Sequence, residues 1–163
     1  MMTIAQIMEK MIAFSEGNIH DITHLSCVWT YAKTIGELEG LDADSLFILE
    51  VAAITHEIAC PLCRKKFGNI NGKYQEQEGA PLVREFLADT GMTAEQIDRV
   101  AYLVGHHHSP AQIDGIDYQI LIEADYIVNA SESGYGQQAI RTFMEHTMKT
   151  AAGIRLTKTV FGV

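Results

Sequence analysis

The chain has 163 residues, of which 47% are hydrophobic and 20% charged, a balance typical of one globular domain. Acidic residues outnumber basic ones by 21 to 12, giving a formal net charge of −9. This charge argues against polymeric nucleic acid as the main ligand, because a phosphate backbone requires a basic surface. The three cysteines are too few for a disulfide framework, so we expect reduced thiols and a cytoplasmic protein.

The N-terminal segment lacks the basic start and short apolar block of a secretory signal, and no window approaches the run of roughly 18 apolar residues needed to cross a membrane. Apolar residues recur at helical spacing, and no segment alternates as a strand does, which predicts an all-α fold. We expect helices over residues 3–15, 21–39, 43–58, 76–90, 94–107, 117–131 and 135–150.

Residues 60–73 contain Pro61 together with glycines and asparagines, and are predicted to form a loop. The expected architecture is a single-domain helical bundle over residues 1–163, with about seven helices. Its C-terminal helix and tail, residues 135–163, dock either on their own domain or on a second subunit in a homo-oligomer.

Three of the expected helices place a histidine or a carboxylate on an apolar face. His24 begins an apolar stripe, His56 and Glu57 end the helix of VAAITHEI, and Asp125 lies within QILIEADYIVNA. Each group alone could be satisfied by an ordinary hydrogen bond, but a buried carboxylate needs a partner, and helix bundles commonly build metal sites from facing side chains. The set favours a divalent first-row ion (Mn, Fe, Ni, Co or Zn). Its expected ligands are His24, His56, Glu57 and Asp125.

Three consecutive histidines, His106, His107 and His108, end the fifth expected helix. Their side chains fan around the helix end, so at most two of them face the same cleft. They are either exposed loop residues or ligands of a second metal and proton-transfer groups, with His107 as the preferred candidate.

Cys60 and Cys63, in the segment CPLC, provide only two of the four ligands of a structural zinc site, and Cys27 is far away in sequence. A redox motif would need a βα context that this helical pattern does not offer. We therefore expect a structural role for this pair.

The metal-ligand candidates resemble the motifs of the HD-domain metal-dependent phosphohydrolases, over about residues 20–130. Members of that family carry a histidine on one helix, a His-Asp doublet at the end of a second helix and an aspartate on a later helix. The matching stretches are THLSCVWTYA, LEVAAITHEI and ILIEADYIVN. The resemblance implies an HD-domain-like fold and a phosphoric ester hydrolase that acts on a small phosphorylated compound, such as a nucleotide.

The sequence departs from the family pattern in two places. The doublet is His-Glu, and because glutamate is one methylene longer, Glu57 would ligate from a shifted position. In some members a further histidine precedes a Gly-Ala pair by four residues, and here that position is Gln75. The candidates to replace it in a second metal site are Glu76 and Glu78.

In this family the metal organises a phosphate and activates a water, and an acidic protein still needs cations near that phosphate. The segment RKKFGNINGK follows the His-Glu doublet closely and is either a solvated loop or the phosphate-binding loop. The predicted phosphate-binding residues are Arg64, Lys65, Lys66 and Lys73. The predicted catalytic residues are Glu57 and His107.

Two other classes of function are compatible with the sequence. A catalytically impaired HD-like module would bind a metal or a nucleotide without turnover, and Glu57 would mark the lost chemistry. An all-α interaction protein would use its histidines structurally. Turnover of phosphate esters with added Mn, Ni or Co separates the enzyme from the impaired module, and thermal stability that does not respond to metal would favour the interaction protein.

Overall fold

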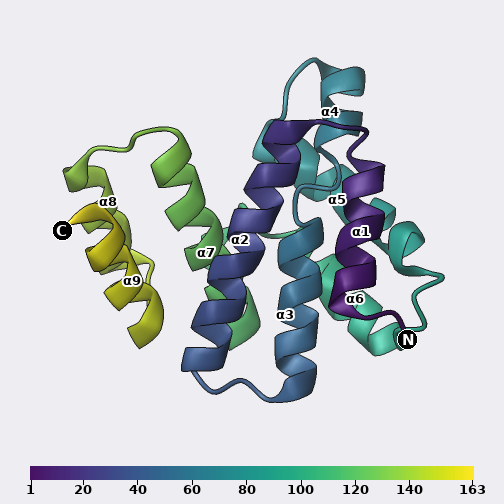
Figure 1. The fold of residues 1–163 in the computed structure, drawn as a ribbon. Coiled ribbons are helices and arrows are strands. Elements are labelled where there is room, and N and C mark those ends of the chain that lie inside the picture. Colours follow the sequence, from purple (N-terminus) through teal and green to yellow (C-terminus); the bar gives the residue numbers. More distant parts are fainter.

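The computed structural model describes residues 1–163 and contains nine α-helices, one short 3₁₀ helix and no strand (Figure 1). In chain order the helices are α1 (Ile4–Phe14), α2 (Ile19–Leu38), α3 (Ala43–Thr55), α4 (Cys60–Phe67), α5 (Gly72–Leu87), α6 (Ala94–Val104), η1 (Pro110–Gln112), α7 (Ile116–Glu132), α8 (Gln137–His146) and α9 (Ala151–Phe161). The all-α prediction is confirmed. The expected number of about seven helices is too low, because residues 60–73 and 135–163 each contain one more helix than predicted.

The centre of the molecule consists of α2, packed between α3 and α7, while α1 and α6 pack on α3 and α5 packs on α6 (Figure 1). The facing sides of the three central helices are fully buried and apolar. Among these core residues are Val28, Ala32, Ile35, Leu49, Ala52, Ala53, Leu121, Ala124 and Ile127. Small residues such as Ala32, Ala52 and Ala124 let the helices approach closely, so any polar side chain on these faces lies deep inside the protein.

The starts of α2 and α3 are defined by side-chain caps. Asn18 accepts a hydrogen bond from the backbone of Asp21, and Asp42 accepts from the backbone N–H groups of Asp44 and Ser45. Caps of this kind satisfy N–H groups that have no partner within the helix. They determine where each helix begins, and hence which residues face the core at its other end.

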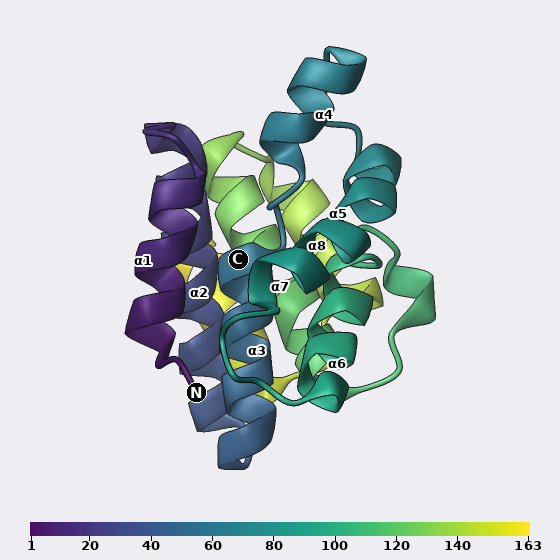
Figure 2. The ribbon, with the colours of Figure 1, turned by 90° about the vertical axis from the view of Figure 1, so that its right-hand side faces the viewer.

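The predicted loop over residues 60–73 is wrong for its first half, which forms α4 at one end of the molecule (Figure 2). Pro61 occupies the first turn of this helix, where its missing N–H costs nothing, and Gly68 ends the helix with φ of +72°. Asp21 of α2 accepts two hydrogen bonds of 2.6 Å from Arg64, which tie α4 to α2. The proline and glycine therefore bound a helix.

The C-terminal region divides into α8 and α9, and α9 packs against α7, α8 and α2 of its own domain. Glu123 of α7 is fully buried, and its carboxylate accepts hydrogen bonds from the backbone of Lys149 (2.7 Å) and Thr150 (3.1 Å) at the start of α9. A Cβ atom at Gly153 would overlap this carboxylate. The start of α9 is thus held to α7 by hydrogen bonds to the buried Glu123 carboxylate.

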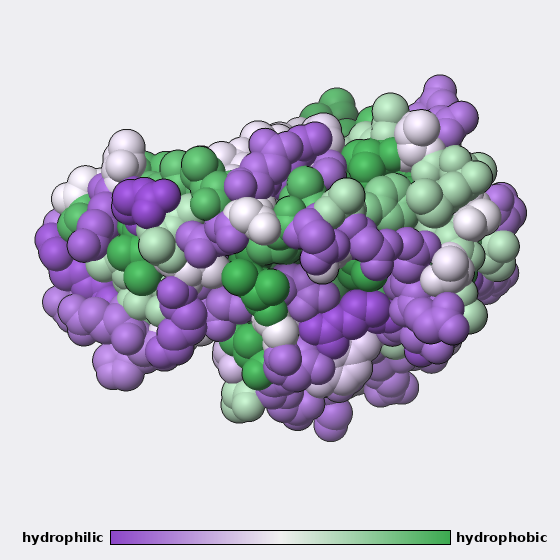
Figure 3. Space-filling model, turned by 90° about the horizontal axis from the view of Figure 1, so that it is seen from below, coloured by the Kyte–Doolittle hydropathy of each residue, from purple (hydrophilic) through white to green (hydrophobic).

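The stretch Ala43–Phe67 is long and apolar enough to cross a membrane by length and composition alone, with a hydropathy of 1.7. This differs from the expectation that no window of the sequence approaches the apolar run needed to cross a membrane. However, the stretch contains two helices, α3 and α4, and 67% of its most apolar window is buried inside the protein, as in the core helix of a globular domain. On the face seen in Figure 3, hydrophilic residues are spread among smaller apolar groups.

Candidate metal centre

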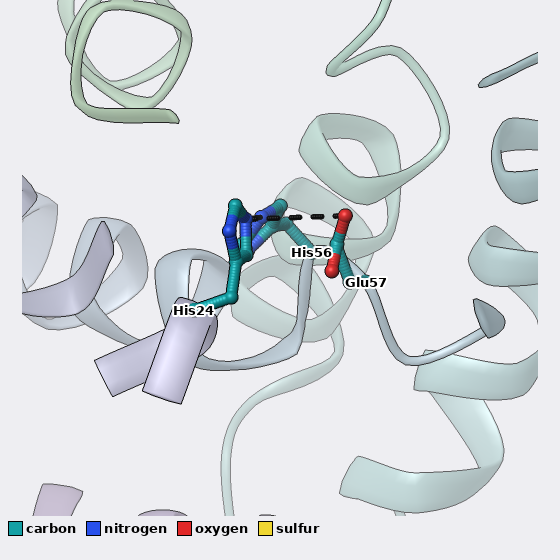
Figure 4. Close-up of side chains that lie close together, drawn as sticks. All are labelled: His24, His56 and Glu57. Atoms are coloured by element: carbon teal, nitrogen blue, oxygen red, sulfur yellow. Dashed lines mark hydrogen bonds and ion pairs between the residues drawn. The ribbon is translucent and has the colours of Figure 1, made fainter. Parts of the chain in front are cut away.

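Side chains from α2, α7 and the end of α3 converge at one buried point. Figure 4 shows three of them, His24 of α2 together with His56 and Glu57. The Nε2 atoms of His24 and His56 are 3.2 Å apart. Oδ1 of Asp125 lies 3.2 Å from the first and 3.4 Å from the second. Oε1 of Glu57 lies 3.9 Å from Nε2 of His24, and one ligand atom from each of His24, His56 and Glu57 falls within a 4.8 Å span. The structure therefore brings together all four residues that the sequence proposes as metal ligands.

The end of α3 explains how two neighbouring residues both reach this point. Successive residues of a continuous helix point about 100° apart. Here α3 ends at Thr55, and His56 and Glu57 lie in the turn that follows. The imidazole of His56 is fully buried, while the side chain of Glu57 keeps 17% of its surface exposed. Glu57 is therefore the member of the cluster that is most open to solvent.

Hydrogen bonds on the opposite ring nitrogens orient the two histidines. Nδ1 of His56 lies 2.8 Å from the carbonyl oxygen of Ala53, which only accepts, so Nδ1 carries the proton and Nε2 presents its lone pair to the cluster. Nδ1 of His24 lies 3.0 Å from a carboxylate oxygen of Glu132. Hydrogen bonding of the remote nitrogen to a carboxylate or carbonyl is the usual support for a metal-ligating histidine.

A third imidazole, that of His107, completes the pattern. It is 2% exposed, its ring centroid lies 5.3 Å from that of His56, and its Nδ1 donates to the carbonyl oxygen of Val104 at 2.8 Å. Its Nε2 is buried and has no hydrogen-bond partner. Buried nitrogen atoms are nearly always paired, so this lone pair requires an explanation.

The charges of the cluster also suit a cation. Burial would raise the pKa of Asp125, but the hydrogen bond from His24 holds it well below its usual range. Burial would lower the pKa of His24, but the hydrogen bond with Asp125 and the charge of Glu57 raise it to about 9. Burial lowers the pKa of His107 well below its ordinary value, with the positive charges of His108 and His56 acting in the same direction.

Imidazole lone pairs and ionised carboxylates are thus gathered in one buried volume. The proton that the raised pKa of His24 favours supplies positive charge at this point, and a bound metal ion would take its place. Neutral imidazole and carboxylate are also the forms in which these side chains bind metals. The residues present therefore fit a divalent first-row metal ion.

Comparisons with known proteins agree with this geometry. No protein-family model matches the chain, and no curated protein matches it. One solved structure is similar, a protein from an uncultured Thermotogales bacterium described as a predicted HD superfamily hydrolase. The two share 22% sequence identity and a TM-score of 0.68, and the match covers 98% of this chain and 83% of the other. The chain has the HD-domain fold. The predicted fold class is confirmed.

Two residues that support the candidate centre were not identified from the sequence. Glu132 bonds Nδ1 of His24, and Asn129 donates to Oδ1 of Asp125 at 2.9 Å. They lie four and seven residues after Asp125, on the same side of α7. This spacing is the signal that could have revealed them.

The other candidates for a second metal site do not join the centre. Nδ1 of His106 bonds the carbonyl oxygen of Tyr102 at 2.7 Å, and its ring stacks on the ring of Tyr102. Glu76 accepts from the backbone of His108 at 3.0 Å, and Glu78 forms an ion pair with a lysine. Only one group of three or more close ligands exists in the chain, and it contains none of these residues.

Gln75, at the position of the family's further histidine, is 3% exposed. Its Nε2 donates to the carbonyl oxygen of Ile70 at 2.8 Å, while its Oε1 has no partner. The amide is thus held by its own loop.

The four basic residues proposed for phosphate binding lie in α4 and at the start of α5. Arg64 is engaged by Asp21, and Lys66 forms an ion pair of 2.6 Å with Glu78. Lys65 and Lys73 form no ion pair in the structure.

A cleft of about 220 Å³ opens beside the centre, between the end of α6, α7 and α8. His107, His108, Asp125 and Asn129 form its polar side, and no arginine or lysine lines it. The proposed basic residues are therefore absent from the cleft that reaches Asp125.

The cysteine pair plays no part in the centre. Cys60 and Cys63 are fully buried free thiols in α4. Burial, together with the negative charge of Glu57, raises the pKa of the Cys60 thiol, so it stays protonated at neutral pH. This environment agrees with the structural role expected for the pair.

Proposed function

We propose that the protein is a metal-dependent phosphohydrolase that cleaves a small phosphate monoester. The observation that carries this proposal is the convergence of lone pairs and ionised carboxylates, including the unpartnered Nε2 of His107, beside an accessible cleft. The HD-domain fold supports it, since the similar solved structure belongs to a predicted HD superfamily hydrolase. At 22% identity that similarity carries the fold, and the reaction is inferred from the site.

Some residues of the centre would bind the metal ion, and others would take part in the reaction. His24, His56 and Asp125 hold the ion, because all three are buried and oriented by hydrogen bonds. A bound divalent ion lowers the pKa of water and offsets charge on phosphoryl oxygens. Glu57 would help to hold the ion, and its partly exposed carboxylate would accept a proton from the attacking water.

His107 has a narrower role than a general acid. Its Nδ1–H is committed to the carbonyl oxygen of Val104, and its lowered pKa keeps Nε2 unprotonated. An unprotonated Nε2 accepts but cannot donate, so it cannot protonate a leaving group. We therefore assign His107 to metal or water binding at the mouth of the cleft.

The expected setting is the cytoplasm. The three cysteines are free thiols, as is usual in a reducing compartment, and the net charge of −9 disfavours polymeric nucleic acid as a partner. A small phosphorylated compound remains the proposed substrate.

The test is phosphate release from a panel of phosphate monoesters with added Mn²⁺, Ni²⁺ or Co²⁺, compared with a chelator. We expect turnover that requires the metal and falls at least a hundredfold in Glu57→Gln, which keeps the shape of the side chain but cannot accept the proton. Metal binding without turnover of any ester would contradict the proposal. It would favour the alternative raised by the His-Glu doublet, a module that binds metal without catalysis.

A further inference from the structure

The cleft beside the metal centre has two chemically different sides. Its polar lining consists of two imidazoles, an amide and the Asp125 carboxylate, and its apolar lining includes three aromatic rings. The aromatic residues are Tyr126, Tyr135 and Phe143. Its volume, about 220 Å³, lies below the range of roughly 300–1,000 Å³ that is usual for drug-sized ligands. The cleft therefore suits a small ligand.

Two of the three rings stack on each other. Tyr126 and Phe143 stack with centroids 3.5 Å apart and ring planes within 1° of parallel. In contrast, the ring of Tyr135 lies 5.8 Å from that of Tyr126 at an angle of 59°, and 44% of the residue is exposed. Its hydroxyl group makes no hydrogen bond in the structure. Tyr135 thus has a ring face that the fold does not use.

The backbone around Tyr135 places this ring at the edge of the cleft. The residue lies in the turn between α7 and α8, flanked by Gly134 and Gly136. Gly134 has φ of +61°, and a Cβ atom at either glycine would meet no atom within 4 Å. The turn is therefore open on both sides of Tyr135, which lines the cleft.

The charges of the cleft limit the number of phosphates that it can hold. No lysine or arginine lines it. The remaining source of positive charge is the metal ion. Several phosphate groups would remain uncompensated next to Asp125, which argues against nucleoside triphosphates and favours a single phosphate.

We propose that the substrate is a phosphate monoester whose leaving group carries a flat, uncharged ring, and that Tyr135 stacks on this ring. This inference rests on the proposed phosphohydrolase function. The phosphate lies at the metal centre, and the ring lies against the exposed face of Tyr135. Stacking of aromatic rings should contribute about a three- to tenfold preference over a ring of the same size that is not flat.

The test compares benzyl phosphate with cyclohexylmethyl phosphate, which have the same phosphate and similar leaving alcohols but differ in the flatness of the ring. The ratio of kcat/KM values is measured for the Mn²⁺-loaded natural protein, for Tyr135→Leu and for the control Tyr31→Leu, which alters a half-buried tyrosine outside the cleft. Binding of benzylphosphonate and cyclohexylmethylphosphonate, which are not hydrolysed, is measured in parallel by calorimetry.

We expect the natural protein and Tyr31→Leu to favour the benzyl compounds about three- to tenfold, in kcat/KM and in affinity. Tyr135→Leu should lose this preference with unchanged metal content. Equal values for the two rings, or a preference that survives in Tyr135→Leu, would overturn the role of Tyr135 and leave the hydrolase function standing. If neither ester were hydrolysed and neither phosphonate bound while other monoesters of the panel were turned over, this inference alone would fail. If no ester of the panel were turned over, the hydrolase function would fail, and this inference with it.

Discussion

Each histidine of the centre has one ring nitrogen in a hydrogen bond, and this bond leaves the other nitrogen to bind a metal. His56 and His107 use backbone carbonyl oxygens for this purpose, at the end of α3 and just after α6. His24 uses the carboxylate of Glu132. Because a charged acceptor makes the imidazole more basic, His24 should be the strongest imidazole ligand of the set.

Glu132→Ala should therefore weaken metal binding about 10- to 100-fold, because Nδ1 of His24 loses its acceptor. Glu132→Gln should weaken it less, since the amide oxygen can still accept the hydrogen bond. The measurement is competition with a calibrated chelator. Equal affinities for the natural protein and Glu132→Ala would show that Glu132 does not support the centre.

The sequence singled out the candidate ligands but not the residues that support them, for a physical reason. His24, His56 and Asp125 interrupt apolar faces, and a polar group in an apolar face is visible without a structure. Glu132 and Asn129 lie near the end of a helix, where polar residues are common. Their role depends on the position of α2 beside α7, which is a long-range contact.

At the scale of the helices, the main difference between expectation and structure is α4. Pro61 and Gly68 can either interrupt a helix or bound a short one, and composition does not distinguish the two cases. The decisive interaction is the pairing of Arg64 with Asp21, which lies 43 residues earlier in the chain. The side chain of Asp21 is 7% exposed, so its carboxylate depends on this partner.

Arg64→Ala should destabilise the protein by about 1–3 kcal/mol, because it leaves the Asp21 carboxylate nearly buried and unpaired. Arg84→Ala is the matched control. Its ion pair with Asp98 is exposed on both sides, so the loss should be at most about 0.5 kcal/mol. Urea unfolding at neutral pH measures both, and equal losses would contradict the role of the Asp21 pair.

The same pair predicts a pH dependence. Burial would raise the pKa of Asp21, but hydrogen bonds from Arg64 hold it below the ordinary value of 3.8. A lowered folded-state pKa stabilises the protein above the unfolded-state pKa, and this stabilisation is lost as the pH falls through the folded-state pKa. The difference in unfolding free energy between the natural protein and Arg64→Ala should therefore be constant above about pH 5 and shrink below about pH 4. A difference that does not change between pH 7 and pH 3 would contradict this assignment.

The junction of α7 and α9 gives a second prediction at this scale. Gly153→Ala would force its Cβ against the buried carboxylate of Glu123 and should cost about 1–3 kcal/mol in urea unfolding. Gly136→Ser is the control, since its Cβ meets no atom within 4 Å and serine is a favoured residue at the start of a helix. If Gly153→Ala were as stable as the control, Glu123 would not hold α9 as described.

For the molecule as a whole, the fold brings together groups that lie far apart in sequence. His24 and Asp125 are 101 residues apart, and their helices are neighbours through the packing of α2 on α7. The order and flanks of the motifs allowed the HD-domain fold to be predicted. The cleft could not be predicted, because it is formed by side chains from three separate segments.

The structure also shows whether the glutamate of the His-Glu doublet can reach the cluster, where the family pattern has an aspartate. Glu57 still reaches the cluster, with Oε1 at 3.9 Å from Nε2 of His24, because it lies in the turn after α3. The longer side chain is accommodated by a position outside the regular helix. We therefore expect the centre to bind metal as it stands.

The metal content of the purified, untagged protein, measured by elemental analysis alongside Glu57→Asp and Asp125→Ala, tests this account most directly. We expect a near-stoichiometric amount of Mn, Fe, Ni, Co or Zn in the natural protein and in Glu57→Asp, and its loss in Asp125→Ala. Metal in Glu57→Asp alone would show that the glutamate disables the centre. The absence of metal from all three proteins, even after incubation with the ions, would contradict a metal centre and leave the histidines with a structural role.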